Sequence, residues 1–84
     1  MNKINLLEKH YLWQIRRINK ILDRFPKWNL SKDIPNHELT FEKFNKIKKE
    51  VENAGGCLEN EYIFLMNARE GFVQKLVRLR GDNV

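Results

Sequence analysis

Residues 4–25 read INLLEKHYLWQIRRINKILDRF, and the spacing of their apolar side chains predicts the fold class. These side chains recur at steps of three or four residues: Ile4, Leu7, Tyr11, Ile15, Ile18, Leu22 and Phe25. Such spacing lines up one face of an α-helix. We expect this helix to begin near residue 3, behind Asn2 as N-cap, and to end at Phe25, because Pro26 disfavours the helical conformation of the residue before it.

Two further stretches, about residues 41–54 and 60–80, show the same periodicity. Thr40 is the expected N-cap of the first and Gly55-Gly56 its end, and its apolar side comprises Phe41, Phe44, Ile47, Val51 and Ala54. The second has Gly81 as its expected end, and its apolar positions are Leu58, Tyr62, Leu65, Phe72, Leu76 and Leu79. Gly71 lies inside this helix, where we expect it to allow close approach of a neighbouring helix.

Residues 26–39 contain both prolines and no sustained period, so they are predicted to form an ordered loop with a turn of helix. Trp28, Leu30 and Ile34 are expected to pin this loop over the end of the bundle. The sequence thus predicts a single all-α domain over residues 1–84, in which the long N-terminal helix packs on a C-terminal antiparallel helical hairpin.

Composition narrows the class of protein. The 84 residues are 42% apolar and 32% charged, which is typical of a soluble globular domain. The single Cys57 cannot form an internal disulfide, and no apolar run approaches the roughly 20 residues of a membrane span, so we expect a cytoplasmic protein with no membrane contact. Lys, Asn and Ile make up 27 of the residues, a bias typical of a low-GC bacterium or its phage.

The sequence does not favour an enzyme. Cys57, the only thiol, has no histidine near it in the sequence to act as its base and is expected to pack at the hairpin turn. His10 and His37 lack a partner ligand three or four residues away, so no metal site is predicted. Gly55-Gly56 lacks the flanking strand and Lys of a phosphate-binding loop. We therefore predict no catalytic residue, no metal and no cofactor.

Charge is distributed unevenly along the chain. Of the net charge of +5, residues 1–37 contribute +5, residues 38–70 contribute −2 and residues 71–84 contribute +2. On the first helix, basic residues and one tryptophan follow helical spacing, with Arg17 beside them: Lys9, Trp13, Arg16, Lys20, Arg24 and Lys27. This basic stripe of seven residues is typical of contact with a polyphosphate chain, because neutralised phosphates release counterions and an exposed indole can stack on a base.

The expected function is therefore binding of a nucleic-acid backbone, RNA or DNA, with little sequence specificity. A helix-turn-helix is disfavoured because Glu59 and Glu61, which follow the short turn, would face phosphates. Lys75, Arg78 and Arg80 would extend the surface if their end of the third helix packs beside the first. The opposing interpretation is that the stripe is only the solvated side of the helix, with Trp13 tucked against the loop.

A second hypothesis is a module for protein–protein interaction, an inhibitor or adaptor of a larger host protein, which docks on an acidic protein surface. The first and third helices both carry wide apolar stripes, and a homodimer is one way to bury their outer flanks.

Overall fold

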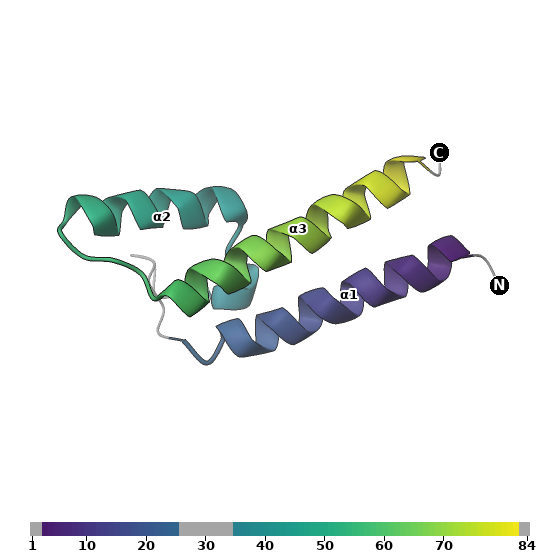
Figure 1. Cartoon of the computed structure of the whole chain (residues 1–84), viewed down its shortest axis with the longest axis horizontal. Coiled ribbons are helices and arrows are strands. Elements are labelled where there is room, and N and C mark those ends of the chain that lie inside the picture. The colour runs from purple at the N-terminus through teal and green to yellow at the C-terminus, as the bar shows by residue number, and fades with distance from the viewer. Residues whose placement is uncertain (1–2, 26–34, 83–84) are drawn as a thin grey trace.

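The structure is a computed structural model that describes residues 3–25 and 35–82. In these residues the chain forms α1 (Lys3–Leu22), the short 3₁₀ helix η1 (Asn36–Glu38), α2 (Phe41–Asn53) and α3 (Asn60–Asp82). Helices α1 and α3 lie side by side and antiparallel, and α2 folds back over the first half of α3 (Figure 1). The predicted all-α three-helix bundle is confirmed. The start of α1 and the end of α3 lie at the same end of an elongated molecule.

Helix α2 begins and turns as the sequence predicts. Thr40 has an extended backbone, and its Oγ1 accepts a hydrogen bond from the Lys43 backbone N–H at 3.2 Å. At the other end Gly55 has a φ of +87°, which a residue with a Cβ rarely adopts. The Gly56 N–H donates to the Val51 carbonyl at 2.9 Å, so the glycine pair ends α2 and turns the chain toward α3.

Helix α1 ends at Leu22, three residues before the predicted end at Phe25. The N–H groups of Arg24 and Phe25 donate to the carbonyls of Ile21 and Leu22 at 3.0 and 3.1 Å, so the last turn is tighter than an α-helix. The Asn36 side-chain amide donates to the carbonyls of Leu22 at 2.7 Å and Phe25 at 3.1 Å. These bonds give the Leu22 carbonyl a second donor besides the Phe25 N–H and bond the Phe25 carbonyl in the turn that follows. They come from a residue outside the helix.

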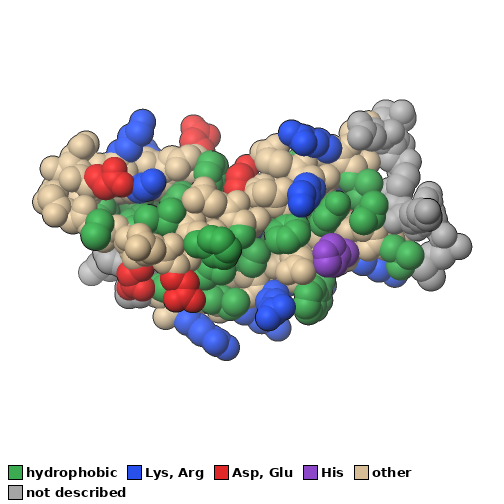
Figure 2. Space-filling view, viewed as in Figure 1, with side chains coloured by type: hydrophobic (Ala, Val, Ile, Leu, Met, Phe, Trp, Pro, Cys, Tyr) green, Lys and Arg blue, Asp and Glu red, His purple; other side chains and the backbone are tan. Residues whose placement is uncertain are grey.

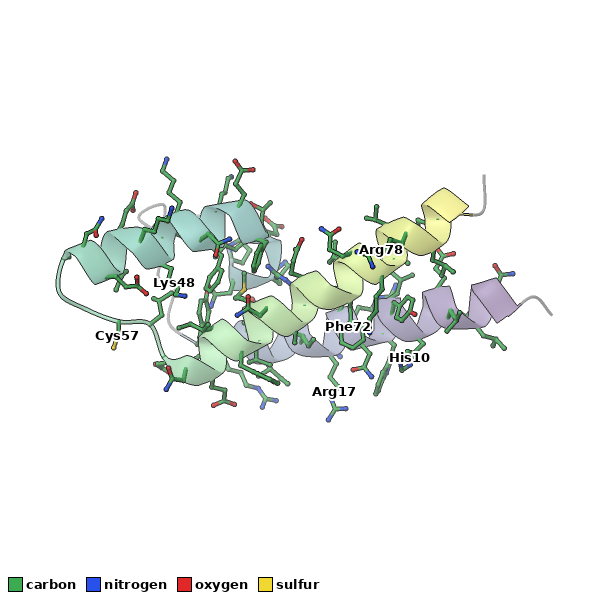
Figure 3. All side chains as sticks on the ribbon, turned by 45° about the horizontal axis from the view of Figure 1, so that its top comes forward. His10, Arg17, Lys48, Cys57, Phe72 and Arg78 are labelled. Carbon is green, nitrogen blue, oxygen red and sulfur yellow. The ribbon has the colours of Figure 1, made fainter. Side chains whose placement is uncertain are left out.

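Three local predictions are wrong. Helix α3 continues to Asp82, because Gly81 keeps a helical backbone instead of the left-handed conformation that would end the helix. A Cβ added at Gly71 would meet nothing within 4 Å in the described part of the chain, so none of the described helices approaches closely there. Cys57 is exposed in the connection between α2 and α3 and does not pack at the turn (Figure 3).

Several other predictions fall on residues 1–2 and 26–34, which lie outside the described residues. They concern capping of the first helix by Asn2, binding by Lys27 and the packing of Trp28, Leu30 and Ile34.

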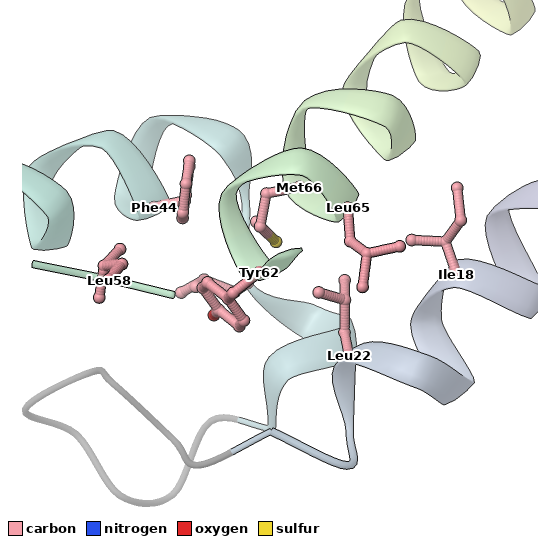
Figure 4. Packing of buried hydrophobic residues seen from close by; sticks show 8 residues of the cluster. Ile18, Leu22, Phe44, Leu58, Tyr62, Leu65 and Met66 are labelled. Atoms are coloured by element: carbon pink, nitrogen blue, oxygen red, sulfur yellow. The ribbon is translucent and has the colours of Figure 1, made fainter. Parts of the chain in front are cut away.

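The core lies where the second half of α1 meets the beginnings of α2 and α3. Tyr62, Leu65 and Met66 of α3 face Ile18 and Leu22 of α1 (Figure 4). Phe44 of α2 and Phe25 contact the Tyr62 ring, with ring centroids 5.8 and 5.6 Å away. Burial of these large side chains is the main stabilising contribution that the described residues offer. None of the described helices is both long and apolar enough to cross a membrane.

Candidate functional site

The outer face of α1 carries the described part of the basic stripe. Ile18 and Leu22 are buried against α3, whereas the six described residues of the stripe are all exposed: Lys9, Trp13, Arg16, Arg17, Lys20 and Arg24. At 3.6 residues per turn, the five that belong to α1 lie within an arc of about 100°, and Arg24 follows in the turn after the helix. Figure 2 shows Lys and Arg side chains projecting from the lower edge of the molecule, along α1.

Part of this face is hollowed into an open depression of about 570 Å³, which we call the α1 depression. Some of the residues that line it were predicted from the sequence as site residues, and others were not. It is lined by Trp13, Arg16, Arg17, Asn19, Lys20, Asp23 and His37. Lys9 lies nearer the N-terminus, in a separate hollow with Asn5, Glu8 and Leu12. Arg24 is exposed but does not line the depression. The structure thus brings four of the seven predicted site residues into one hollow.

Trp13 and Arg17 form a pair at this site. The Arg17 guanidinium carbon lies 5.6 Å from the centroid of the Trp13 ring, a distance at which the cation is attracted to the aromatic face. Trp13 nevertheless remains 55% exposed, so the described structure does not bury it. Figure 3 shows Arg17 pointing away from α3. The indole is therefore held by a neighbouring cation and still offered to solvent.

One acidic residue, Asp23, interrupts the basic surface, and η1 holds its carboxylate. Asp23 Oδ1 accepts a hydrogen bond from the His37 backbone N–H at 3.0 Å, and Oδ2 lies 2.9 Å from His37 Nδ1. Among residues 3–25 and 35–82, no carboxylate lies within 4.0 Å of a cationic nitrogen of the stripe. The positive charges of the stripe are therefore not neutralised by ion pairs inside the described part of the chain.

Beneath the depression lies a buried polar cluster that the sequence analysis did not predict. Arg69 of α3 is only 7% exposed. Its Nη1 donates to Asn19 Oδ1 at 2.9 Å and to the carbonyls of Asn36 and His37 at 3.3 and 3.2 Å, and its Nη2 donates to the Leu39 carbonyl. Because Asn19 also lines the α1 depression, Arg69 connects the floor of the site to η1 and α3.

The protonation of this cluster is shaped by burial. Desolvation lowers the pKa of the Arg69 guanidinium, and electrostatic interactions with Tyr62, Glu70 and Asp23 partly oppose that shift. Desolvation also raises the pKa of the Tyr62 hydroxyl, and the positive charge of Arg69 partly opposes this shift. The neutral Tyr62 hydroxyl donates to Asn36 Oδ1 at 3.4 Å. A buried cation bonded mainly to carbonyls is a structural clamp rather than a binding group, since both of its terminal nitrogens already donate within the protein.

A signal for Arg69 was present in the sequence. It lies three or four residues from Leu65, Met66 and Phe72, and so within the apolar stripe of the predicted third helix. A lone charge in such a stripe must be bonded when it is buried. The sequence could not show which carbonyls it binds, because they come from η1, about 30 residues earlier in the chain.

The other candidate groups gather into no second site. His10 lies against Tyr11 and Phe72, with ring centroids 5.9 and 6.4 Å away, in an aromatic contact between α1 and α3. Cys57 is exposed. Within the described ranges, no three His, Cys, Asp or Glu side chains come close enough together to hold a metal ion.

Comparison of the chain with known protein families, curated proteins and solved structures finds no match. Its function must therefore be argued from the chemistry of the α1 face.

Proposed function

We propose that this protein is a non-enzymatic nucleic-acid-binding protein that holds the sugar–phosphate backbone of RNA or DNA along the outer face of α1. The observation that carries the proposal is the basic face itself: Lys9, Arg16, Arg17, Lys20 and Arg24 are exposed, and no described carboxylate pairs with them. Each phosphate that such a cation neutralises releases condensed counterions, which favours association.

The identity of the cations supports the proposal. An arginine can bind two phosphate oxygens at once through its planar fork, which a lysine cannot do. Arg16 and Arg17 both line the α1 depression, next to Lys20. On α3, by contrast, Arg80 is paired with Glu8 at 3.0 Å. The proposed surface therefore rests on α1 and does not depend on the end of α3.

A titration with labelled RNA and DNA oligonucleotides across a salt series tests the proposal. If all five described cations contact phosphate, the slope of log affinity against log salt should be about −4. The double charge reversal Arg16→Glu/Lys20→Glu should abolish binding while circular dichroism stays unchanged. The matched control is Lys46→Glu/Lys49→Glu, which makes the same change of net charge on exposed residues of α2 and should weaken binding far less.

Two results would contradict the proposal. The first is the absence of binding at low salt. The second is an equal loss of affinity in both double variants, which would mean that net charge matters and the α1 face does not.

A second candidate function is supported by exposed apolar side chains. Leu6 on α1 and Phe64 and Val77 on α3 are all more than half exposed, and large exposed apolar side chains can contribute to protein interfaces. In this second function, the protein binds the acidic surface of a larger protein and acts as its inhibitor or adaptor. Capture of a partner from nuclease-treated host lysate, lost in Arg16→Glu/Lys20→Glu, would favour it over nucleic acid. The homodimer expected from the sequence stays a prediction, which light scattering of the purified chain tests.

A further inference from the structure

The α1 depression combines two chemistries that backbone binding alone does not require together. Its cations, Arg16 and Lys20, suit phosphate, whereas Trp13 offers an aromatic surface that is 55% exposed. The face of an indole, unlike its N–H group, does not attract a phosphate, but it stacks well on the flat face of a nucleobase. Trp13 therefore indicates a ligand that has a flat aromatic group in addition to its phosphates.

We propose that the α1 depression takes an unpaired nucleobase of a single-stranded nucleic acid, stacked on Trp13, while Arg16 and Lys20 bind the phosphates on either side of that base. This inference rests on the proposed function and specifies its substrate as single-stranded. A base inside a duplex is already stacked and paired, so Trp13 could reach it only after the duplex opened, at a cost in free energy.

The geometry of the aromatic group favours stacking. The Arg17 guanidinium lies 5.6 Å from the Trp13 centroid and so restricts the motion of the ring before any ligand arrives. A platform that is already positioned loses less conformational freedom on binding than a free side chain does. The depression of about 570 Å³ lies in the size range of pockets that take small molecules, and it is open to solvent, as a site on a continuous strand must be.

The polar groups of the depression indicate little selectivity among bases. The carboxylate of Asp23 is engaged by the backbone N–H and the ring of His37. Asn19 Oδ1 accepts from Arg69 at 2.9 Å. Because these acceptors are already bonded within the protein, few remain to recognise the edge of a particular base. Stacking tolerates every base, since each has a π-face.

Three labelled ligands of equal length, about ten nucleotides, separate the two chemistries. They are an oligothymidine strand, an abasic strand that keeps the phosphates without bases, and a duplex. Stacking on one base should make the oligothymidine strand bind about 5- to 160-fold more tightly than the abasic strand. The duplex has two backbones and a higher charge density than either strand, so its affinity is compared only between the original chain and Trp13→Ala, where it should not change.

Variants test whether Trp13 causes the difference in affinity between the oligothymidine strand and the abasic strand. Trp13→Ala should reduce the affinity for oligothymidine to that for the abasic strand and leave abasic binding unchanged, whereas Trp13→Phe should keep most of the difference. The matched control is Phe64→Ala, which removes another exposed aromatic group outside the depression and should change neither affinity. In a Trp28→Phe background, Trp13 is the only tryptophan, and its fluorescence should be quenched by oligothymidine but not by the abasic strand.

The outcomes distinguish failure of this inference from failure of the proposed function. If no ligand binds at low salt, the proposed function itself is wrong. If the oligothymidine and abasic strands bind equally and Trp13→Ala binds as the original chain does, the function stands and the stacking site is wrong. An equal loss of affinity for both strands in Trp13→Ala would also overturn the stacking site, because Trp13 would then only shape the phosphate surface.

Discussion

The two ends of the molecule are built differently. At the closed end, where the last turn of α1 meets η1, α2 and α3, Leu22, Tyr62 and Met66 are fully buried. At the open end, α1 and α3 are the only described elements and pack on each other, and Leu6 and Val77 are more than half exposed. The contacts found there include the Glu8–Arg80 ion pair and the aromatic contact of His10 with Phe72 (Figure 3).

The comparison shows how a chain of this size can keep a whole helix face free. An enclosed core needs side chains from several directions, and among the described elements only the closed end provides them. Helix α1 is anchored there by Ile18 and Leu22, and its other side packs against nothing in the described structure. We expect stability to reside at the closed end and binding on the free face of α1.

The largest effect is expected from Phe44, whose side chain is 1% exposed in the closed end. Phe44→Ala should lower the free energy of unfolding by about 3–5 kcal/mol, because it removes buried area and leaves a cavity. Phe64→Ala, at a position 69% exposed, should change it by less than about 0.5 kcal/mol. Urea denaturation of both variants measures the difference. If Phe44→Leu and Phe44→Ala both unfolded like the original chain, the core would be placed wrongly.

The next effect is expected from the Arg69 clamp. Arg69→Ala removes the guanidinium donor from the Leu39 and His37 carbonyls and from Asn19 Oδ1. It should cost about 2–3 kcal/mol, a fall in Tm of about 8 °C or more for a domain of this size. Arg69→Lys should recover part of this, since an ammonium cannot reach all four oxygens with the fork geometry of Arg69. Arg78→Ala removes an exposed arginine of the same helix and should leave Tm nearly unchanged. Equal melting of the Arg69 and Arg78 variants would argue against the clamp.

The smallest effect is expected at the open end. Glu8 and Arg80 pair at 3.0 Å with Arg80 largely exposed, and exposed pairs contribute about 0–1 kcal/mol. Glu8→Gln should therefore lower the free energy of unfolding by less than about 1 kcal/mol, and by less still at high salt. Thermal melts at low and high salt measure both. A loss as large as that of Arg69→Ala would mean that the open end contributes as much to stability as the closed end.

The helices could be predicted because their causes are local. Apolar spacing of three and four residues marks α1, α2 and α3, and the Thr40 cap and the left-handed Gly55 set the bounds of α2. The predicted helix ends were wrong where residues from another segment bond the end of the helix, or where one residue type can either end a helix or continue it. Helix α1 ends early in a tight turn whose carbonyls are bonded by Asn36, from another segment. Gly81 can end a helix or continue it, and here it continues α3.

The candidate site likewise has features that the sequence determines and features that depend on contacts between distant residues. The exposure of the stripe follows from the sequence, because residues spaced by three and four on the side opposite Ile18 and Leu22 must face away from α3 once those two are buried. Helical periodicity therefore determined the side on which Trp13, Arg16 and Lys20 lie. Only the tertiary structure could decide that His37 engages Asp23 at the edge of that face and that Arg69 fixes Asn19 beneath it. Those contacts join residues 14 and 50 positions apart, a separation that only the folding of the chain brings within hydrogen-bond distance.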